Sequence, residues 1–188
     1  MIKDSIYTKC KKIKLIATDV DGVLTDGGRY YSEKGEVMKK FHVRDGMGIN
    51  ILLRNKIKTI IITKENSKIV KKWAKDVNVT KVYSNVIKKE SIIKQITEEF
   101  SIKPSEIAYI GDDVNDVEIA KKVGLSATPK DGIIAMKKIT QYVCTLGGGQ
   151  GSFRELSDLI LTQKFKNSTI WYWNRFNYNY FCCLIWYS

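Results

Sequence analysis

The chain has 188 residues, of which 44% are hydrophobic and 28% are charged, and this balance is that of an ordinary globular domain with a buried core. No run reaches the ~18 consecutive apolar residues that a membrane-spanning helix needs, and the N-terminal segment lacks the apolar stretch of a signal peptide. The four cysteines show neither metal-ligand spacing nor a disulfide framework, so we expect a cytoplasmic protein.

The net charge of +12 comes from 32 basic and 20 acidic residues. A charge of this sign attracts anions such as phosphorylated sugars, or nucleic acid. The lysines are scattered along the whole chain, and no segment before the C-terminal tail is both basic and aromatic. We therefore interpret the charge as a lysine-rich solvated surface, and we expect neither a nucleic-acid nor a membrane partner.

Short apolar runs alternate with segments of helical periodicity along the chain. The runs predict strands at 13–18, 58–63, 79–83, 107–110 and 125–127. The periodic segments predict helices at 46–55, 67–76, 88–100 and 116–123. Strands that alternate with helices indicate a parallel sheet covered by helices on both faces, which is a three-layer α/β fold.

One insertion interrupts the alternation after the first strand. Residues 28–32 and 36–42 flank a glycine-containing turn and predict a β-hairpin at about 28–42. No insert of about 50 residues or more occurs, so we expect no separate cap domain. The segment from Trp171 onward is rich in aromatic residues and asparagine. We expect one core domain at 1–162, with residues 163–188 outside it.

Acidic residues follow two of the predicted strands. Asp19 and Asp21 come directly after the first strand, and Asp112, Asp113 and Asp116 come after the strand at 107–110. Ligands of open parallel sheets bind outside the carboxyl ends of the strands. Carboxylate oxygens from two neighbouring strands suit Mg²⁺, which also binds substrate phosphate.

A hydroxyl and an ammonium accompany these carboxylates. Thr63 ends its predicted strand, and Lys89 lies just ahead of a helix. Groups of these two kinds can hold and neutralise a phosphoryl oxygen. An isolated Asp-x-Asp sequence is more often a solvated acidic turn, so the prediction depends on the four features together.

Together these features resemble the haloacid dehalogenase superfamily. Its four motifs occur in order, as DVDGVLT at 19–25, Thr63, Lys89 and GDDVND at 111–116. The resemblance implies a Rossmann-like fold and a Mg²⁺-dependent phosphomonoesterase, in which Asp19 attacks phosphorus to form an aspartyl-phosphate. Asp21 would protonate the leaving alkoxide and then deprotonate the attacking water. Thr63 and Lys89 would bind the phosphoryl group.

The same resemblance implies a metal site. Mg²⁺ would be held by the carboxylate of Asp19, the backbone carbonyl of Asp21 and the carboxylate of Asp112. Asp113 and Asp116 would lie one shell further out and orient Lys89 and the waters on the metal.

A narrower resemblance is to the 3-deoxy-D-manno-octulosonate 8-phosphate (KDO 8-phosphate) phosphatase family. It rests on TDGGRYY at 25–31, KFHVRDGMGI at 40–49, VGLSATPKD at 123–131 and GGGQGSFRE at 147–155. The resemblance covers about residues 11–162. It implies a homotetramer without a cap domain, in which the hairpin and a neighbour's glycine-rich segment help to enclose the site.

One position departs from the octulosonate pattern. Octulosonate phosphatases usually have Gly-Arg after the Thr63 position, whereas this chain has Lys64, Glu65 and Asn66. Glu65 resembles the nonulosonate relatives, which act on sialic-acid-type 9-phosphates such as KDN 9-phosphate and N-acylneuraminate 9-phosphate. Alternatively, residues 64–66 only cap the helix that begins near 67. The sugar acid therefore stays open.

Several residues near the expected mouth of the site are candidates for substrate binding. They are Thr25, Arg44, Asp45, Gly46, Glu65 and Arg154. Arg44 and Asp45 open the helix after the hairpin and could contact the sugar acid, or they could serve only helix-start electrostatics. Arg154 could reach a neighbouring subunit's substrate, or pair with Glu155 on the surface.

Two other functions stay open at this point. A non-catalytic partner domain, like the phosphatase-like domains fused to acylneuraminate cytidylyltransferases, would be expected to have lost Asp19, Asp21 or Lys89. A nucleic-acid-end phosphatase would fit the basic charge and would bind polynucleotides with a steep salt dependence, but the chain lacks a basic stripe.

Overall fold

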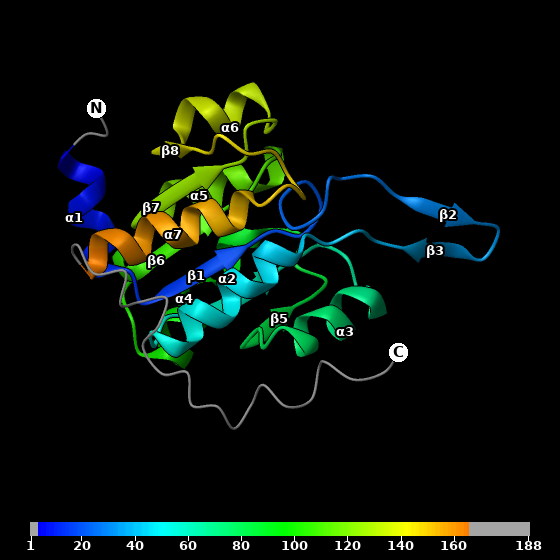
Figure 1. The fold of residues 1–188 in the computed structure, drawn as a ribbon, viewed down its shortest axis with the longest axis horizontal. Coiled ribbons are helices and arrows are strands. Elements are labelled where there is room, and N and C mark those ends of the chain that lie inside the picture. The colour runs from blue at the N-terminus through cyan, green and yellow to red at the C-terminus, as the bar shows by residue number, and fades with distance from the viewer. Residues whose placement is uncertain (1–3, 166–188) are drawn as a thin grey trace.

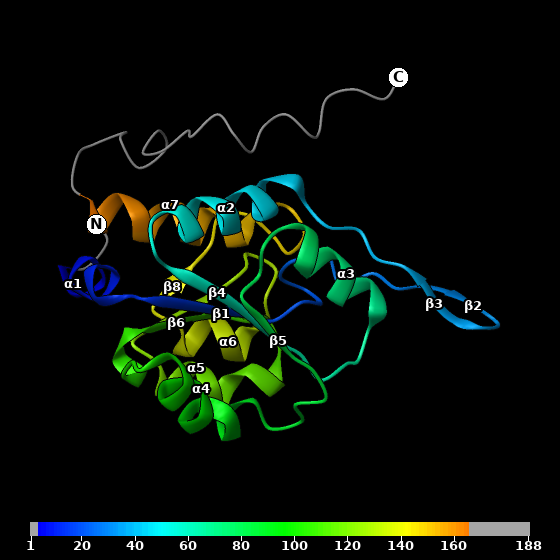
Figure 2. The same ribbon diagram turned by 90° about the horizontal axis from the view of Figure 1, so that it is seen from below.

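The computed structural model describes residues 4–165, which form a six-stranded parallel sheet between two layers of helices (Figure 2). The strand order is β5–β4–β1–β6–β7–β8. The strands are β1 (Leu15–Thr18), β4 (Lys58–Ile62), β5 (Lys81–Tyr83), β6 (Ile107–Ile110), β7 (Leu125–Thr128) and β8 (Tyr142–Val143). The three-layer α/β fold predicted from the alternating pattern is confirmed.

Each face of the sheet carries its own helices and its own apolar core. One face is covered by α1 (Asp4–Lys12), α2 (Val43–Arg54), α3 (Lys68–Asp76) and α7 (Ser152–Lys164). The other face is covered by α4 (Ile93–Phe100), α5 (Val117–Lys122) and α6 (Ile134–Ile139). Three short 3₁₀ helices, η1 (Lys89–Ile92), η2 (Pro104–Glu106) and η3 (Val114–Asp116), lie in the connections.

The central strand β1 is buried along its whole length. Ile16 packs into the core beneath α2 and α7, while its neighbours Leu15 and Ala17 pack into the core beneath α4 and α5. This alternation explains why β1 reads as one continuous apolar run, since a strand between two helical layers has no polar face. In the register, Thr18 lies opposite Ile61 of β4 and Ile110 of β6. The residues that follow these three strands therefore emerge side by side.

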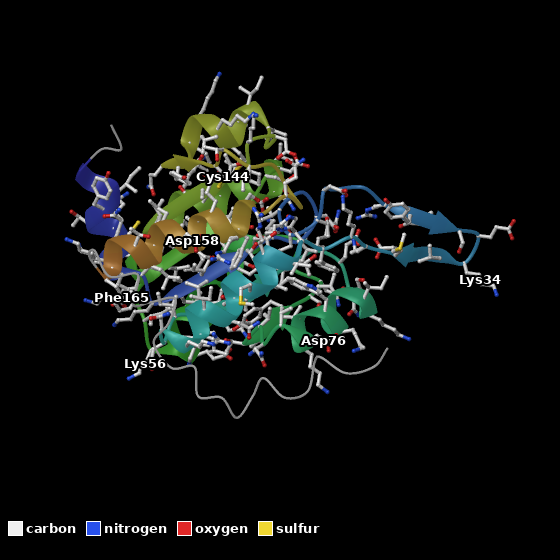
Figure 3. All side chains as sticks on the ribbon, in the orientation of Figure 1. Lys34, Lys56, Asp76, Cys144, Asp158 and Phe165 are labelled. Carbon is white, nitrogen blue, oxygen red and sulfur yellow. The ribbon has the colours of Figure 1, made fainter. Side chains whose placement is uncertain are left out.

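The predicted hairpin is present as a separate two-stranded sheet, β2 (Tyr30–Ser32) and β3 (Gly35–Met38). It projects away from the body of the molecule (Figure 1). Lys34 lies at its tip (Figure 3), next to Gly35, whose φ of 106° is in the region that favours glycine. No second domain is inserted within residues 4–165.

Some elements begin or end elsewhere than predicted. Helix α2 starts at Val43 rather than at residue 46, because the imidazole Nδ1 of His42 caps it by accepting from the backbone N–H of Arg44. Helices α1, α6 and α7 and strand β8 were not predicted. Within residues 4–165 no helix combines the length and apolar character needed to cross a bilayer. The aromatic segment from Trp171 onward lies outside the described residues.

Candidate active site

A cleft of about 450 Å³ opens at the carboxyl ends of β1, β4 and β6. Its lining is polar and mostly charged: Asp19, Asp21, Arg29, Thr63, Lys64, Glu65, Asp112, Asp113 and Asn115. Residues from four parts of the sequence meet here, since the three strand ends are adjacent and the base of the hairpin contributes Arg29.

Lys89 lies at the floor of this site with its side chain fully buried. Its Nζ is 2.7 Å from Asp19 Oδ2 and 2.7 Å from Asp116 Oδ1. Burial alone would lower the pKa of the ammonium, but Asp19 and Asp116 outweigh this effect and raise it. Lys89 is therefore a fixed positive charge beside the Asp19 carboxylate.

Asp116 is a fully buried carboxylate whose two oxygens are both occupied. Oδ1 accepts hydrogen bonds from Lys89 Nζ at 2.7 Å and from the Tyr109 hydroxyl at 2.5 Å. Oδ2 accepts from the backbone N–H groups of Asp112 at 2.9 Å and Asp113 at 3.3 Å. Asp116 thus fixes Lys89 and the loop after β6 rather than offering a free oxygen.

Asp19 is almost fully buried but remains accessible from the cleft. Its Oδ1 accepts from the backbone N–H of Val20 at 2.7 Å, and its Oδ2 faces Lys89. Burial raises its pKa to about 6, against the opposing effect of Lys89. The adjacent Lys89 ammonium favours the carboxylate form of Asp19, which is the form that a nucleophile needs.

Asp112 completes an acidic cluster that could hold a cation. Carboxylate oxygens of Asp19, Asp112 and Asp116 lie within 4.8 Å of one another. Asp112 Oδ1 is buried without a hydrogen-bond partner, and burial together with Asp19 raises the pKa of this carboxyl to about 8. An orphaned carboxylate oxygen beside Asp19 fits a divalent metal, because the cation would supply both the missing partner and the missing positive charge.

The loop after β1 places Asp21 in the lining of the same cleft. Gly22 has a φ of 85°, which lets the chain turn sharply after Asp21. Asp21 Oδ1 accepts hydrogen bonds from Thr25 Oγ1 at 3.2 Å and from Lys39 Nζ at 2.6 Å. The Asp21 side chain is about one quarter exposed. A carboxyl held at one oxygen beside a nucleophile is suited to proton transfer.

Comparisons with known proteins agree with this geometry. The sequence model of the haloacid dehalogenase-like hydrolase family matches residues 43–124. The KDO 8-phosphate phosphatase KdsC of Haemophilus influenzae is 36% identical over 160 residues, which are 85% of this chain and 89% of that protein. KdsC of Escherichia coli K12 is also 36% identical over 160 residues, 85% of either chain.

A solved structure gives the same result. The KDO 8-phosphate phosphatase of Moraxella catarrhalis, described with magnesium ion, phosphate ion and KDO, superimposes with a TM-score of 0.83 at 34% identity. The match covers 86% of this chain and 93% of that one. The chain belongs to the KDO 8-phosphate phosphatase family. It is therefore a phosphatase of the haloacid dehalogenase type, as the four motifs indicated.

Within this phosphatase fold, the predicted catalytic and metal residues are brought together. Asp19, Asp21, Thr63, Asp112 and Asp113 line the cleft. Phosphatases of this superfamily use a divalent metal, and the acidic cluster described above is where one would bind.

Five of the six predicted substrate-binding residues, all except Glu65, do not line the cleft. Thr25 is buried and donates a hydrogen bond to Asp21 Oδ1. Asp45 is fully buried and accepts from the backbone N–H of Arg154 at 2.8 Å. Arg44 and Arg154 line a separate cleft of about 530 Å³, and Arg154 Nε pairs with Asp158 at 2.7 Å rather than with Glu155. Gly46 packs near Trp73 and Val77. Their role in substrate binding stays a prediction.

The phosphatase cleft also contains Glu65, the residue that departs from the octulosonate pattern. The cap of α3 is Ser67, whose hydroxyl accepts from the backbone N–H of Val70, so residues 64–66 do not fill that role. Glu65 instead forms an ion pair with Arg29. Sequence reasoning missed Arg29 and Lys39, because nothing local shows that the base of the hairpin lies beside the cleft.

Proposed function

We propose that this phosphatase hydrolyses the phosphate ester of an ulosonic sugar acid, with KDO 8-phosphate as the first candidate, through an aspartyl-phosphate on Asp19. One observation carries the proposal: Asp19 Oδ2 lies 2.7 Å from the buried Lys89 ammonium, and Asp19 shares an acidic cluster with Asp112, which has a buried oxygen without a partner. The substrate is supported by the names of its relatives and by the KDO and phosphate bound in the Moraxella catarrhalis enzyme.

We further propose Mg²⁺ as the cofactor. Asp19 and Asp112 would hold it through their carboxylates and Asp21 through its backbone carbonyl. Bound there, Mg²⁺ would offset the repulsion between the Asp19 carboxylate and a phosphate dianion. The Mg²⁺ in the Moraxella catarrhalis enzyme and the hard oxygen donors of this cluster support that choice over a softer metal.

Each catalytic residue would then have a separate role in the reaction. Lys89 and Thr63 hold the transferring phosphoryl group while Asp19 attacks phosphorus. Asp21 gives its proton to the leaving sugar oxygen as the P–O bond breaks. In the second half, Asp21 takes a proton from water as this water attacks the aspartyl-phosphate, which restores Asp19 and releases inorganic phosphate.

Glu65 supports a second candidate substrate, a sialic-acid-type 9-phosphate. Glu65 and Lys64 both line the cleft, and the side chain of Glu65 is about one third exposed there. A carboxylate at this position would disfavour a substrate carboxylate nearby and favour hydroxyl groups, which changes the orientation that a sugar acid can take.

The exposed hairpin supports the homotetramer as part of the proposal. Tyr31 is 63% exposed, Val37 is 56% exposed and Val43, at the start of α2, is 86% exposed. A two-stranded hairpin with apolar residues in water is marginally stable by itself, so a second copy of the chain would be expected to cover it.

The test is Mg²⁺-dependent phosphate release from KDO 8-phosphate, KDN 9-phosphate, N-acylneuraminate 9-phosphate and an aryl phosphate. We expect a strong preference for one sugar acid, and Asp19→Asn should lower kcat by at least about 10³-fold with the fold unchanged, since it removes the nucleophile. Full activity in Asp19→Asn would refute the mechanism. No release from any substrate by the native chain would favour the non-catalytic partner domain.

A further inference from the structure

Lys39 is a buried cation at the junction between the hairpin and the active site. It follows β3 directly, and its side chain is 0% exposed. Its Nζ is 2.6 Å from Asp21 Oδ1, 2.7 Å from Glu36 Oε1 and 3.9 Å from Glu65 Oε2. A fully buried ammonium is costly unless it is paired, so three surrounding carboxylates account for its place.

The charge of Lys39 is secured by these neighbours. Asp21 and Glu36 each place a carboxylate oxygen within 2.7 Å of the ammonium, so their negative charges compensate for its burial. Glu36 is itself held from the other side, because its Oε2 accepts from the Ser67 hydroxyl at the N-terminus of α3 at 3.3 Å. The Lys39 ammonium is thus fixed by the hairpin and by α3 together.

Lys39 does not line the cleft, so a substrate there would meet Asp21 and not the ammonium. The hydrogen bonds from Lys39 and Thr25 both end on Asp21 Oδ1. Two donors on one oxygen fix the plane of the carboxyl group, and they leave Oδ2 as the oxygen that can exchange a proton with the substrate.

We propose that Lys39 is a positioning residue for proton transfer by Asp21, and that it makes this transfer depend on the base of the hairpin. The inference rests on the proposed function. In the first step the Asp21 proton moves to the sugar oxygen as the P–O bond breaks, and in the second step Asp21 regains a proton from water. Without Lys39, the Asp21 carboxyl is held by Thr25 alone and its Oδ2 loses its fixed direction.

The leaving group supplies a readout that a purely structural role would not move. A sugar alkoxide needs a proton as it departs, whereas p-nitrophenolate leaves without one. The ratio kcat/KM covers the steps up to departure of the leaving group. Loss of positioning at Asp21 should therefore lower kcat/KM for the sugar-acid phosphate far more than for p-nitrophenyl phosphate.

The experiment compares Lys39→Met with Lys40→Met, a matched change at the next residue, whose side chain is 66% exposed. For Lys39→Met we expect kcat/KM to fall ~10- to 100-fold on the sugar-acid phosphate and less than ~3-fold on p-nitrophenyl phosphate, within the range of acid–base catalysis. Lys40→Met should match the native enzyme on both substrates. The Mg²⁺-induced rise in melting temperature should persist in Lys39→Met, because the metal ligands are untouched.

Equal losses of kcat/KM on both substrates, or no loss at all, would overturn the role of Lys39. If Lys39→Met does not fold, Lys39→Gln replaces it, since the amide keeps a donor without the charge, and the same two outcomes decide. A native enzyme that releases no phosphate from either substrate would overturn the proposed function and this inference with it. A native enzyme that is active, combined with equal losses in the variant, overturns the inference alone.

Discussion

The cation that faces Asp19 is outnumbered by the carboxylates around it. Lys89 is fully buried between Asp19 and Asp116, while Asp112 lies close by with a buried oxygen that has no partner. Burial raises the pKa of Asp112 to about 8 and that of Asp19 to about 6. When all three are ionised, Asp19, Asp112 and Asp116 carry three negative charges against the single positive charge of Lys89, which is the reason a divalent cation is expected to complete the site.

Gly22 permits this cluster to form, and its substitution is a test at the scale of one residue. An added Cβ at Gly22 would lie 2.0 Å from Asp112 Oδ2. We therefore expect Gly22→Ala to displace Asp112, to weaken Mg²⁺ binding and to lower kcat by about 10-fold or more, as loss of a correctly placed ligand does. Mg²⁺-dependent thermal shift and phosphate release measure the two effects.

Gly35→Ala is the matched control, since Gly35 also has a positive φ but an added Cβ there meets nothing within 4 Å. It carries the same backbone strain without the clash, and it should bind Mg²⁺ like the native chain. Equal Mg²⁺ binding in the two variants would contradict the account of Gly22.

At the scale of elements, the apolar runs predicted the bounds of a strand correctly where every residue of that strand is buried. Strand β6 has the predicted bounds, Ile107–Ile110, and every residue in it is buried. Helix α7 was missed although Phe153, Leu156 and Ile160 have helical spacing and are fully buried, because its N-cap is Gly151, which offers no capping side chain. Helix α1 carries a weaker signal, since among residues 6–12, whose side chains the structure describes, the buried apolar ones are Ile6 and Cys10 on a lysine-rich segment.

Some residues of the candidate site could be predicted from the sequence and others could not. The motif residues could be predicted because each follows a strand whose end the pattern locates. The contact between Lys39 and Asp21 could not be predicted, because the two residues are 18 positions apart and only the folded chain brings the base of the hairpin next to Asp21. Asp45 shows a second limit of the sequence, since a position at the start of a helix does not show whether a side chain points to the cleft or into a helix–helix contact.

The buried Asp45 between α2 and α7 predicts a pH dependence of stability. Its Oδ1 accepts from the backbone N–H of Arg154, its Oδ2 is unpartnered, and burial raises its pKa from 3.8 to about 7. Between these two values the folded state binds more protons than the unfolded state. The free energy of unfolding should therefore fall as pH rises from about 4 to about 7, by at most about 1.4 kcal/mol per pH unit.

Asp45→Asn keeps an acceptor for the Arg154 N–H but cannot ionise. The variant should therefore lack the pH-dependent part of the unfolding free energy that Asp45 contributes. Urea denaturation at several pH values measures the difference in unfolding free energy between Asp45→Asn and the native chain, which should grow in favour of the variant as pH rises. Asp76→Asn, at an exposed site (Figure 3), is the control and should show no such trend. A constant difference for Asp45→Asn would exclude a buried, ionising Asp45.

At the scale of the whole molecule, charge and shape have separate consequences. The net charge of +12 is spread over the chain, and it raises the local concentration of anionic substrates without defining a site. The hairpin extends the molecule on the side where the cleft opens (Figure 1), and its base supplies Arg29 and Lys39. An assembly that covers the hairpin would therefore also fix the surroundings of Asp21.

The central claim is that Asp19 is phosphorylated and that Asp21 moves the protons, and one measurement tests both parts. Asp21→Asn is mixed with an aryl phosphate and Mg²⁺, quenched in acid and digested, and the peptide that contains Asp19 is weighed by mass spectrometry. An aryloxide leaves without a proton, but the second step still needs a base, so the account predicts that a phosphoryl group accumulates on Asp19. Asp19→Asn should show none. Phosphate release by the native chain with no phosphoryl group on Asp19 in the Asp21 variant, or with the group on another residue, would contradict the account.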